Sequence, residues 1–274
     1  MMIDLYKNYP TALDHAQLYA WHEMLTNGRR DLLDVGKYRT HQEPMQIVSG
    51  ALDCSKIHYE APPSSTTKHE MQQFIRWFNQ SGKTSGGQFE PITRSGITHL
   101  YFESIHPFED GNGQIGRALS EKVLSQGLNQ LILIALSHTI ESHKKKCYAA
   151  LQRNSTHLEI TDWLEYFAQM VLKAQDYTQS MIDFLIEKGK FYQRFDSLIN
   201  ERQRKVIARI FRAGVNRFRG GLGADNYRSI TNTTASTATR GLQKLVKLEA
   251  FIKKGERKGT RYYLNINHSI VQNI

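Results

Sequence analysis

Apolar side chains recur at helical spacing through most of the chain. In the segment 66–81, Met71, Phe74, Ile75 and Phe78 fall at i, i+3, i+4 and i+7, which places them on one face of a helix. Further helices are predicted over residues 14–26, 91–105, 113–126, 137–154 and 160–187. The pattern therefore predicts a mainly α body.

One segment of this body has a different pattern. A short apolar run over residues 45–48 and an alternating run over 57–59 are separated by turn-forming residues at 49–53. Runs of this kind, closed here by Pro62 and Pro63, are typical of a β-hairpin with a long loop.

The C-terminal segment has its own pattern of elements. Helices are predicted over 202–213, 224–230 and 235–251, and a two-stranded ribbon follows over 251–266. Three helices and a ribbon resemble a winged-helix domain. The sequence therefore predicts two domains, residues 1–195 and residues 196–274.

Charge separates the two parts of the chain. The formal net charge is +10, yet residues 1–200 hold 20 Lys and Arg against 22 Asp and Glu, whereas residues 201–274 hold 16 against 4. This asymmetry indicates a polyanionic or acidic partner for the C-terminal part alone.

Composition excludes several classes of protein. Cys54 and Cys147 are the only cysteines and lie far apart, which argues against a disulfide framework and a cysteine zinc site. No uninterrupted apolar stretch of about eighteen residues exists, and the N-terminus lacks a secretory pattern. We expect a cytoplasmic protein without a membrane partner.

The densest candidate chemistry lies in "HPFEDGNGQIGRAL", residues 106–119. The glycine-asparagine-glycine run 111–113 precedes a predicted helix, whose unpaired N–H groups and positive end attract phosphate. Arg117 is one turn into that helix and can reach back to a terminal phosphate. Asp110 can hold Mg²⁺, and His106 can accept a proton near neutral pH. The neighbouring Glu109 is interpreted as a solvated loop acid.

The order of these residues resembles the Fic family motif, H-P-F-x-[D/E]-G-N-G-R-x-x-R. The matching positions are His106, Pro107, Phe108, Asp110, Gly111, Asn112, Gly113 and Arg117. The departure is Gln114, where the family usually has an arginine. A looser resemblance covers residues 14–187. It implies a Fic-type helical bundle with a β-hairpin flap, followed by the smaller winged-helix domain.

The resemblance implies transfer of AMP from ATP to a Ser, Thr or Tyr hydroxyl of a target protein, or of the chain itself. His106 would be the base, and Phe108 a core anchor of its loop. Asp110 would hold Mg²⁺ between the α- and β-phosphates. The nucleotide-binding residues would also include Gly111, Asn112 and Gly113 around the phosphates, Gln114, and Arg117 at the γ-phosphate. Because glutamine carries no charge, Gln114 predicts weaker nucleotide binding than the family arginine gives.

The hairpin resembles the Fic flap, whose edge aligns an extended target segment by strand addition. Met45, Gln46, Ile47 and Val48 would form this target flap. Over the nucleotide would lie Ile47, Val48, Ser49 and Gly50. Tyr148 would lie near the adenine, where simple core packing is the alternative.

Many Fic proteins carry an inhibitory helix, [S/T]-x-x-x-E-[G/N], whose glutamate pairs with the arginine corresponding to Arg117. The nearest approach identified is the stretch 66–71, which has the wrong spacing between Thr67 and Glu70. We expect that the helix is absent from this chain, which would be a naturally short form, a form without its N-terminal segment, or one half of a pair with a separate antitoxin. We also expect that this form is not self-inhibited.

The predicted winged helix has two possible partners. In a DNA-binding form, the third helix would read bases with Ser236, Thr237, Thr239 and Arg240. Its ribbon would meet phosphates through Lys253, Lys254, Arg257, Lys258 and Arg261. Alternatively, this domain docks the target protein or a partner subunit. For the whole chain, the alternatives to AMP transfer are a nucleotide-sensing DNA-binding regulator and a Fic-type transferase of another phosphate-containing group.

Overall fold

A computed structural model describes residues 1–49, 56–82, 89–154, 159–214 and 220–266, apart from the side chains of 47–49, 56–58 and 258. The chain divides into two compact units, Met1–Asp176 (unit 1) and Tyr177–Ile274 (unit 2). The sequence predicts a boundary after residue 195, so the two divisions differ by one stretch of helix.

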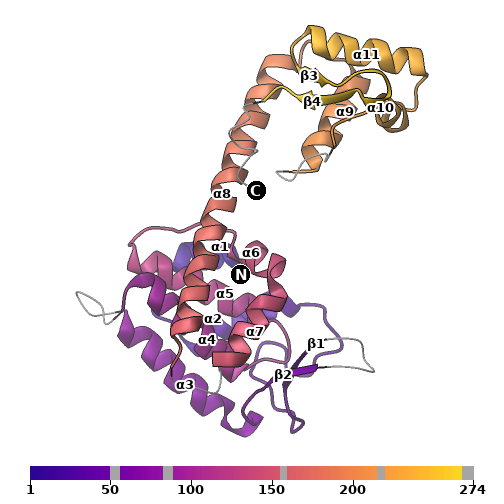
Figure 1. Ribbon diagram of the computed structural model, residues 1–274. Helices are drawn as coiled ribbons and strands as arrows, with labels where there is room; N and C mark the ends of the chain where they lie inside the picture. The colour runs from indigo at the N-terminus through magenta and orange to yellow at the C-terminus, as the bar shows by residue number, and fades with distance from the viewer. Residues whose placement is uncertain (50–55, 83–88, 155–158, 215–219, 267–274) are drawn as a thin grey trace. The chain divides into compact units, whose positions relative to one another are not determined.

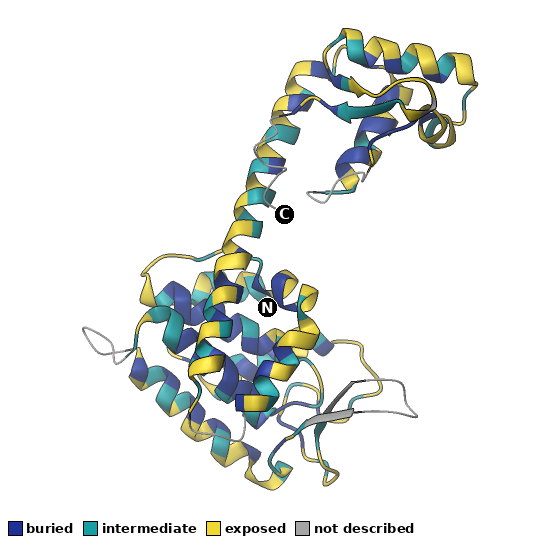
Figure 2. Ribbon diagram, in the orientation of Figure 1, coloured by how far each residue is buried: buried dark blue, intermediate teal, exposed yellow. Residues whose placement is uncertain are grey.

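Unit 1 is a bundle of helices, and the predicted mainly helical fold is confirmed (Figure 1). Its helices are α1 (Met2–Asn8), α2 (His15–Thr26), α3 (Ser64–Ser81), α4 (Pro91–Ile105), α5 (Asn112–Gly127), α6 (Leu136–Ser142), α7 (Lys144–Asn154) and the first part of α8 (Thr161–Phe195). Figure 2 shows their buried positions facing the interior of the bundle and their exposed positions facing outward.

Helices α4 and α5 form the centre of unit 1. Phe102 on α4 and Ile115 and Leu119 on α5 are fully buried in one apolar cluster. Gly96 of α4 lets α8 approach closely, because a Cβ there would lie 3.0 Å from the side chain of Leu164. The loop that joins α4 to α5 is therefore held between two packed helices.

The predicted hairpin is present beside this centre. Strands β1 (Gln46–Ser49) and β2 (Lys56–Glu60) pair antiparallel, with a register irregularity between Ile47 and Val48. The Tyr59 hydroxyl of β2 donates a hydrogen bond to the backbone oxygen of Ser104 at 2.6 Å. This bond ties the hairpin to the last turn of α4.

Three predicted helix bounds are wrong. The single helix over 137–154 is two helices, since the backbone leaves helical geometry at His143, whose ring bonds the Thr139 carbonyl oxygen at 2.9 Å. The helix predicted to end at 187 continues to Phe195. The helix predicted to reach 251 ends at Lys247, because Glu249 adopts a positive φ of 58°. Helix α1 was not predicted.

Unit 2 contains α9 (Glu201–Arg212), α10 (Ala224–Thr231), α11 (Ala235–Lys247), the paired strands β3 (Phe251–Lys254) and β4 (Arg261–Leu264), and a short 3₁₀ turn (Arg257–Gly259). Its core includes Val206, Leu242 and Leu245, joined by Phe191 and Phe195 of α8. Those α8 aromatics explain why residues 177–195 belong with this unit.

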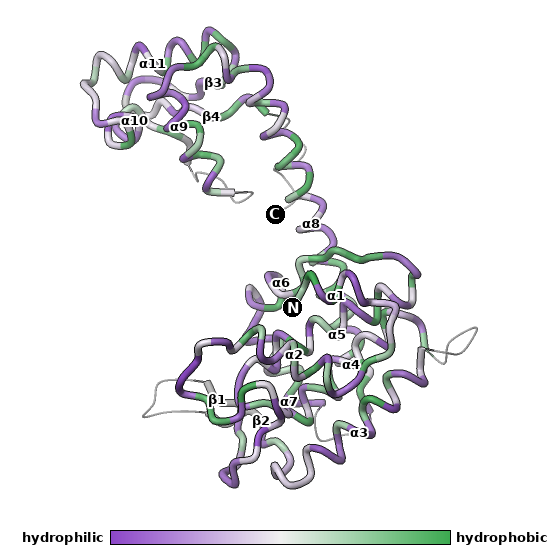
Figure 3. Tube along the Cα trace, turned by 180° about the vertical axis from the view of Figure 1, so that it is seen from behind, coloured by the Kyte–Doolittle hydropathy of each residue, from purple (hydrophilic) through white to green (hydrophobic). Residues whose placement is uncertain are grey.

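Hydrophobic and hydrophilic residues are interspersed along the helices of both units (Figure 3). Within the described ranges, no helix is long and apolar enough to cross a membrane.

Candidate active site

The loop between α4 and α5 begins and ends with left-handed backbone. His106 closes α4 with a φ of 48°, and its N–H donates to the Phe102 carbonyl oxygen at 3.0 Å. Gly111 opens α5 with a φ of 80°. A non-glycine residue in this conformation is strained and persists only where its surroundings hold it. Contacts with neighbouring residues must therefore hold the backbone of His106 in this conformation.

Arg39 supplies much of that support. Its side chain is buried, and its Nε donates to the His106 carbonyl oxygen at 2.8 Å. Its Nη2 donates to the Pro62 oxygen at 2.6 Å, and its backbone N–H donates to the Pro107 oxygen at 2.9 Å. Burial lowers the pKa of the Arg39 guanidinium. The sequence analysis missed this residue, since no local pattern links it to a loop that follows far later in the chain.

Phe108 and Asn112 close the loop from within. Phe108 is fully buried, as expected of a core anchor, and stacks on the His22 ring with centroids 4.2 Å apart. The Asn112 side chain accepts a bond from the Phe108 N–H at 2.9 Å and donates one to the Phe108 carbonyl oxygen at 2.7 Å. Both ends of the Asn112 amide thus shape the loop.

A cavity of about 300 Å³ lies at this loop. The structure brings most of the predicted site residues to its wall: His106, Asp110, Gly111, Asn112, Gly113, Gln114, Arg117, Tyr148, Met45 and Gln46. Ile47, Val48 and Ser49 belong to β1, but their side chains are outside the description. Gly50 lies outside the described residues altogether.

His106 has the ionisation state that a base needs. Its side chain is only 12 % exposed, and burial lowers its pKa to about 4, so the imidazole is neutral at pH 7. Its Nδ1 lies 3.7 Å from a carboxylate oxygen of Glu103. Burial raises the pKa of Glu103 to about 7. Glu103 also lines the cavity, and its place three residues before His106, at the end of the helix predicted over 91–105, could have revealed it.

Arg117 lies on α5 one turn after Gly113. A Cβ at position 113 would come within 3.0 Å of the Arg117 Nη1, so glycine there leaves room for the guanidinium. No side chain caps the N-terminus of α5. Both Arg117 and the first turn of α5 are therefore positioned to attract an anion in the cavity.

Helix α6 contacts the same arginine. The Arg117 Nε donates to Ser137 Oγ at 3.0 Å, while Glu141 lines the cavity and pairs with Lys144 at 3.4 Å. Ser137 and Glu141 have the spacing of the Ser-x-x-x-Glu part of the inhibitory motif, followed by Ser142 in place of Gly or Asn. The segment 137–142 therefore matches the motif's spacing better than the stretch 66–71 does.

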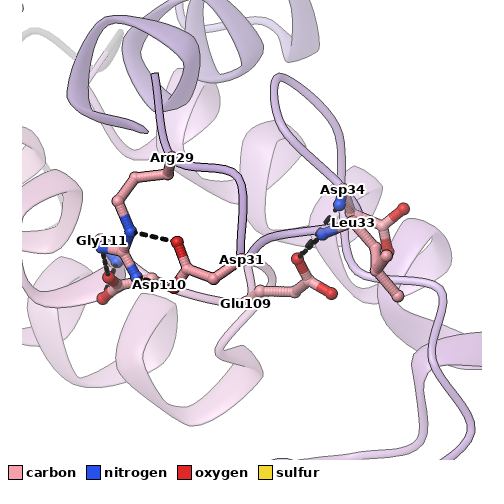
Figure 4. Close-up of polar contacts among 7 residues, drawn as sticks. All are labelled: Arg29, Asp31, Leu33, Asp34, Glu109, Asp110 and Gly111. Atoms are coloured by element: carbon pink, nitrogen blue, oxygen red, sulfur yellow. Dashed lines mark hydrogen bonds and ion pairs between the residues drawn. The ribbon is translucent and has the colours of Figure 1, made fainter. Parts of the chain in front are cut away.

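Asp110 and Glu109 face different partners (Figure 4). The Asp110 carboxylate accepts bonds from the Gly111 N–H at 2.7 Å and from Arg29 Nη1 at 2.9 Å. Glu109 is not a merely solvated acid, because one of its oxygens accepts bonds from the backbone N–H groups of Leu33 and Asp34, at 2.8 and 3.1 Å. It fastens the segment after α2 to the loop.

The donor set at Asp110 fits one kind of metal site. Each of its oxygens accepts one hydrogen bond, which leaves lone pairs for a cation. Mg²⁺ is commonly bound by one or two carboxylates together with substrate phosphates. No group of three or more His, Cys, Asp or Glu side chains in the described part of the chain is arranged to hold a metal. Asp110 therefore fits a magnesium ion shared with a nucleotide.

Comparison with known proteins gives a family match that includes α4, the loop between α4 and α5, and most of α5. Residues 12–124 match the model of the Fic/DOC family. A probable protein adenylyltransferase of Aquifex aeolicus (strain VF5) is 32 % identical over 77 residues. That alignment covers 28 % of this chain and 22 % of the relative, so the chain matches about a fifth of the relative's length.

Solved structures show the same fold. A Fic family protein from Desulfovibrio desulfuricans G20 aligns with a TM-score of 0.53 at 20 % identity, over 96 % of this chain and 72 % of that one. A Fic domain containing signaling protein from Bacteroides thetaiotaomicron VPI-5482 aligns with a TM-score of 0.50 at 18 % identity, over 63 % of this chain and 65 % of that one. The chain therefore carries a Fic/DOC family domain over residues 12–124.

Proposed function

We propose that this protein transfers AMP from ATP to a hydroxyl side chain of a target protein and releases pyrophosphate. The observation that carries the proposal is one cavity lined by a neutral, largely buried His106, by Arg117 and by the uncapped N-terminus of α5. The Fic/DOC match and the relative named as a probable protein adenylyltransferase support the same reaction.

His106 is the proposed general base. Its neutral imidazole accepts the proton of the incoming Ser, Thr or Tyr hydroxyl, and the hydroxyl oxygen bonds to the α-phosphorus. The bond between that phosphorus and the bridging oxygen breaks, and pyrophosphate leaves with the electron pair. Glu103, whose carboxylate lies 3.7 Å from Nδ1, stabilises the imidazolium that forms.

The positive groups of the cavity hold the triphosphate. The first-turn N–H groups of α5 and the guanidinium of Arg117 bind phosphate oxygens and stabilise charge that develops on them. Asp110 would hold Mg²⁺, which supplies further neutralisation of phosphate charge. Gln114 adds a hydrogen-bonding group without charge.

The hairpin is the proposed docking edge for the target. Among the described strands, β1 pairs with β2 alone, which leaves its other edge available to an extended segment. Met45 and Gln46 line the cavity next to this edge, and Ile47 and Val48 continue it. Ser49, the last residue of β1, is proposed to lie over the nucleotide. Tyr148 lines the cavity and is proposed to contact the adenine.

Two labels of ATP test the reaction. The purified protein, alone and with a cell lysate, is incubated with magnesium and ATP labelled at either the α- or the γ-phosphate. We expect the α-label on protein, an AMP-sized mass increase on a hydroxyl residue, and a loss of about a hundredfold or more in His106→Ala. A γ-label on protein would indicate phosphoryl transfer instead, and no label would favour a nucleotide-sensing regulator.

A further inference from the structure

Helix α11 of unit 2 presents a polar face without a single carboxylate. Ala238, Leu242 and Leu245 are buried in the core, whereas the outward positions hold hydroxyl, amide and basic groups. The exposed members are Ser236, Thr239, Arg240, Gln243, Lys244 and Lys247. Such a face combines uncharged hydrogen-bonding groups near the helix start with positive charge towards its end.

The position of α11 is fixed by close packing against α9 and α10. A Cβ on Gly241 would lie 2.5 Å from the Tyr227 hydroxyl of α10, so the two helices touch at this glycine. The buried Gln203 of α9 donates from Nε2 to the Gly241 carbonyl oxygen at 3.0 Å. The segment between α10 and α11 is short, and Asn232 in it has a φ of 48°. Two helices joined by a short turn, with the second one outward, form a helix-turn-helix arrangement.

A second group of cations lies on the β3–β4 pair. Lys253 and Lys254 end β3, and Arg257 follows in the connecting turn; all three are exposed. Of the carboxylates that the structure describes, none forms an ion pair with these three residues or with Arg240, Lys244 and Lys247.

The acids of this region leave the positive charge largely uncompensated. Residues 201–274 contain four acidic residues, of which Asp225 pairs with Arg228 at 3.2 Å and Glu249 pairs with Arg194 at 3.1 Å. Glu201 lies in the first turn of α9, and Glu256 follows β3. A polyanion is therefore the partner whose charge this surface complements.

We infer that unit 2 binds duplex DNA, with α11 in the major groove and the β3–β4 pair against the phosphate backbone. The major groove of B-form DNA is about 12 Å wide and admits an α-helix, whereas the deep, narrow major groove of duplex RNA does not. Arg240, one turn into α11, can donate two bonds to a guanine edge, and Ser236 can bond either base type. Lys253, Lys254 and Arg257 neutralise phosphates.

The test measures binding of the full-length protein to a fluorescein-labelled, mixed-sequence DNA duplex of about 30 base pairs by anisotropy, across a salt series. Each phosphate contact contributes about −0.9 to the slope of log K against log salt. The triple variant Lys253→Ala, Lys254→Ala, Arg257→Ala should weaken binding at least about tenfold and make the slope shallower by roughly two to three. Adding Arg240→Ala to the triple variant should weaken DNA binding further.

A matched control removes the same charge from unit 1. Lys68→Ala, Arg76→Ala and Lys173→Ala replace three exposed cations there and should leave the affinity within about twofold. A Gln version of the β3–β4 triple, which keeps side-chain length, must show the same loss as the Ala version. Circular dichroism establishes that each variant is folded.

Four results would overturn the inference. They are no DNA binding at 50 mM salt, an equal loss in the unit 1 control, equal or tighter binding of an RNA duplex of the same sequence, and tighter binding of polyglutamate, an acidic-protein probe. The test is independent of AMP transfer, because His106→Ala should bind DNA as the parent chain does.

Discussion

The cavity of unit 1 and the basic surface of unit 2 use charge in opposite ways. In unit 1, Glu103 and Arg39 are buried and His106 is nearly so, and burial moves the pKa of each away from its usual value. In unit 2, Arg240 and Lys254 are exposed to solvent. Buried ionisable groups are suited to proton transfer, whereas exposed cations attract a polyanion over a distance.

The N-termini of α5 and α11 show the same contrast. Gly111 opens α5 with left-handed backbone, and no side chain caps the helix. Thr234 opens α11, and its hydroxyl accepts the Thr237 N–H at 3.4 Å. An uncapped first turn keeps its N–H groups for a ligand, while a capped first turn satisfies its own. We therefore expect phosphate binding at the start of α5 and side-chain recognition along α11.

Among the substitutions that test the contrast between the two units, Arg39→Met is expected to have the largest effect on stability. The substitution removes the donor from the carbonyl oxygens of His106 and Pro62, in a buried place that water cannot fill freely. We expect the free energy of unfolding of unit 1 to fall by about 4 kcal/mol and AMP transfer to fall with it. All three tryptophans, Trp21, Trp77 and Trp163, lie in unit 1, so their fluorescence during urea unfolding reports on that unit.

Arg76→Met is the control for that substitution, because Arg76 is exposed on α3. Its effect should stay within about 0.5 kcal/mol. A loss in Arg39→Met no larger than in the control would show that the buried guanidinium does not hold the loop.

A somewhat smaller effect is expected from Glu121→Gln. Glu121 is 3 % exposed on α5, its Oε2 has no hydrogen-bond partner among the described residues, and burial raises its pKa to about 8. The folded state thus binds the proton more tightly than the unfolded state. The stability from this group is complete below about pH 4.5 and is lost as pH rises through 8. The Gln variant, which cannot ionise, should lose about 3 kcal/mol less between pH 5 and pH 8.

Tryptophan fluorescence in urea at both pH values measures this difference. Glu165→Gln, at an exposed position of α8, is the control and should follow the parent chain. Parallel pH dependence of Glu121→Gln and the parent would show that burial of Glu121 does not couple its protonation to folding.

Local sequence patterns were sufficient to predict most helices and strands and the site residues that are close together in sequence. The helix predicted over 91–105 has those bounds in the structure, because its apolar positions and Pro91 are both local signals. Most residues of the range 106–117 line one cavity, and they lie together in sequence. Arg39 and Ser137 come from distant segments to contact His106 and Arg117, so tertiary packing alone reveals them. Phe191 and Phe195 extend α8 because they pack in unit 2, a contact that helical periodicity does not specify.

Gly241→Ala tests unit 2 and is expected to lower its stability moderately. The new methyl group would meet the Tyr227 hydroxyl at 2.5 Å, which forces α11 away from α10. We expect unit 2 to lose about 2 kcal/mol of stability, seen as faster hydrogen exchange of α9–α11 amides, and DNA affinity to fall. Gly189→Ala is the control, since a Cβ at that helical position meets nothing within 4 Å. If Gly241→Ala also shifted the tryptophan transition of unit 1, the two units would not be energetically separate.

The smallest effect is expected from Gln114→Arg, which restores the charge found at this position of the Fic motif. Gln114 lines the cavity beside the N-terminus of α5, so a guanidinium there can donate a charge-assisted bond to a phosphate oxygen. We expect ATP to bind about tenfold more tightly, because an ionic donor contributes roughly 1–2 kcal/mol more than a neutral amide. Isothermal titration calorimetry with ATP and magnesium measures the dissociation constant, and Gln130→Arg, outside the cavity lining, adds the same charge as a control.

An equal gain in both variants would mean that net charge alone attracts the nucleotide. An unchanged or weaker affinity in Gln114→Arg would show that this wall of the cavity does not face the triphosphate. DNA affinity should stay unchanged in both, because positions 114 and 130 lie in unit 1, whereas the proposed DNA-binding surface lies in unit 2.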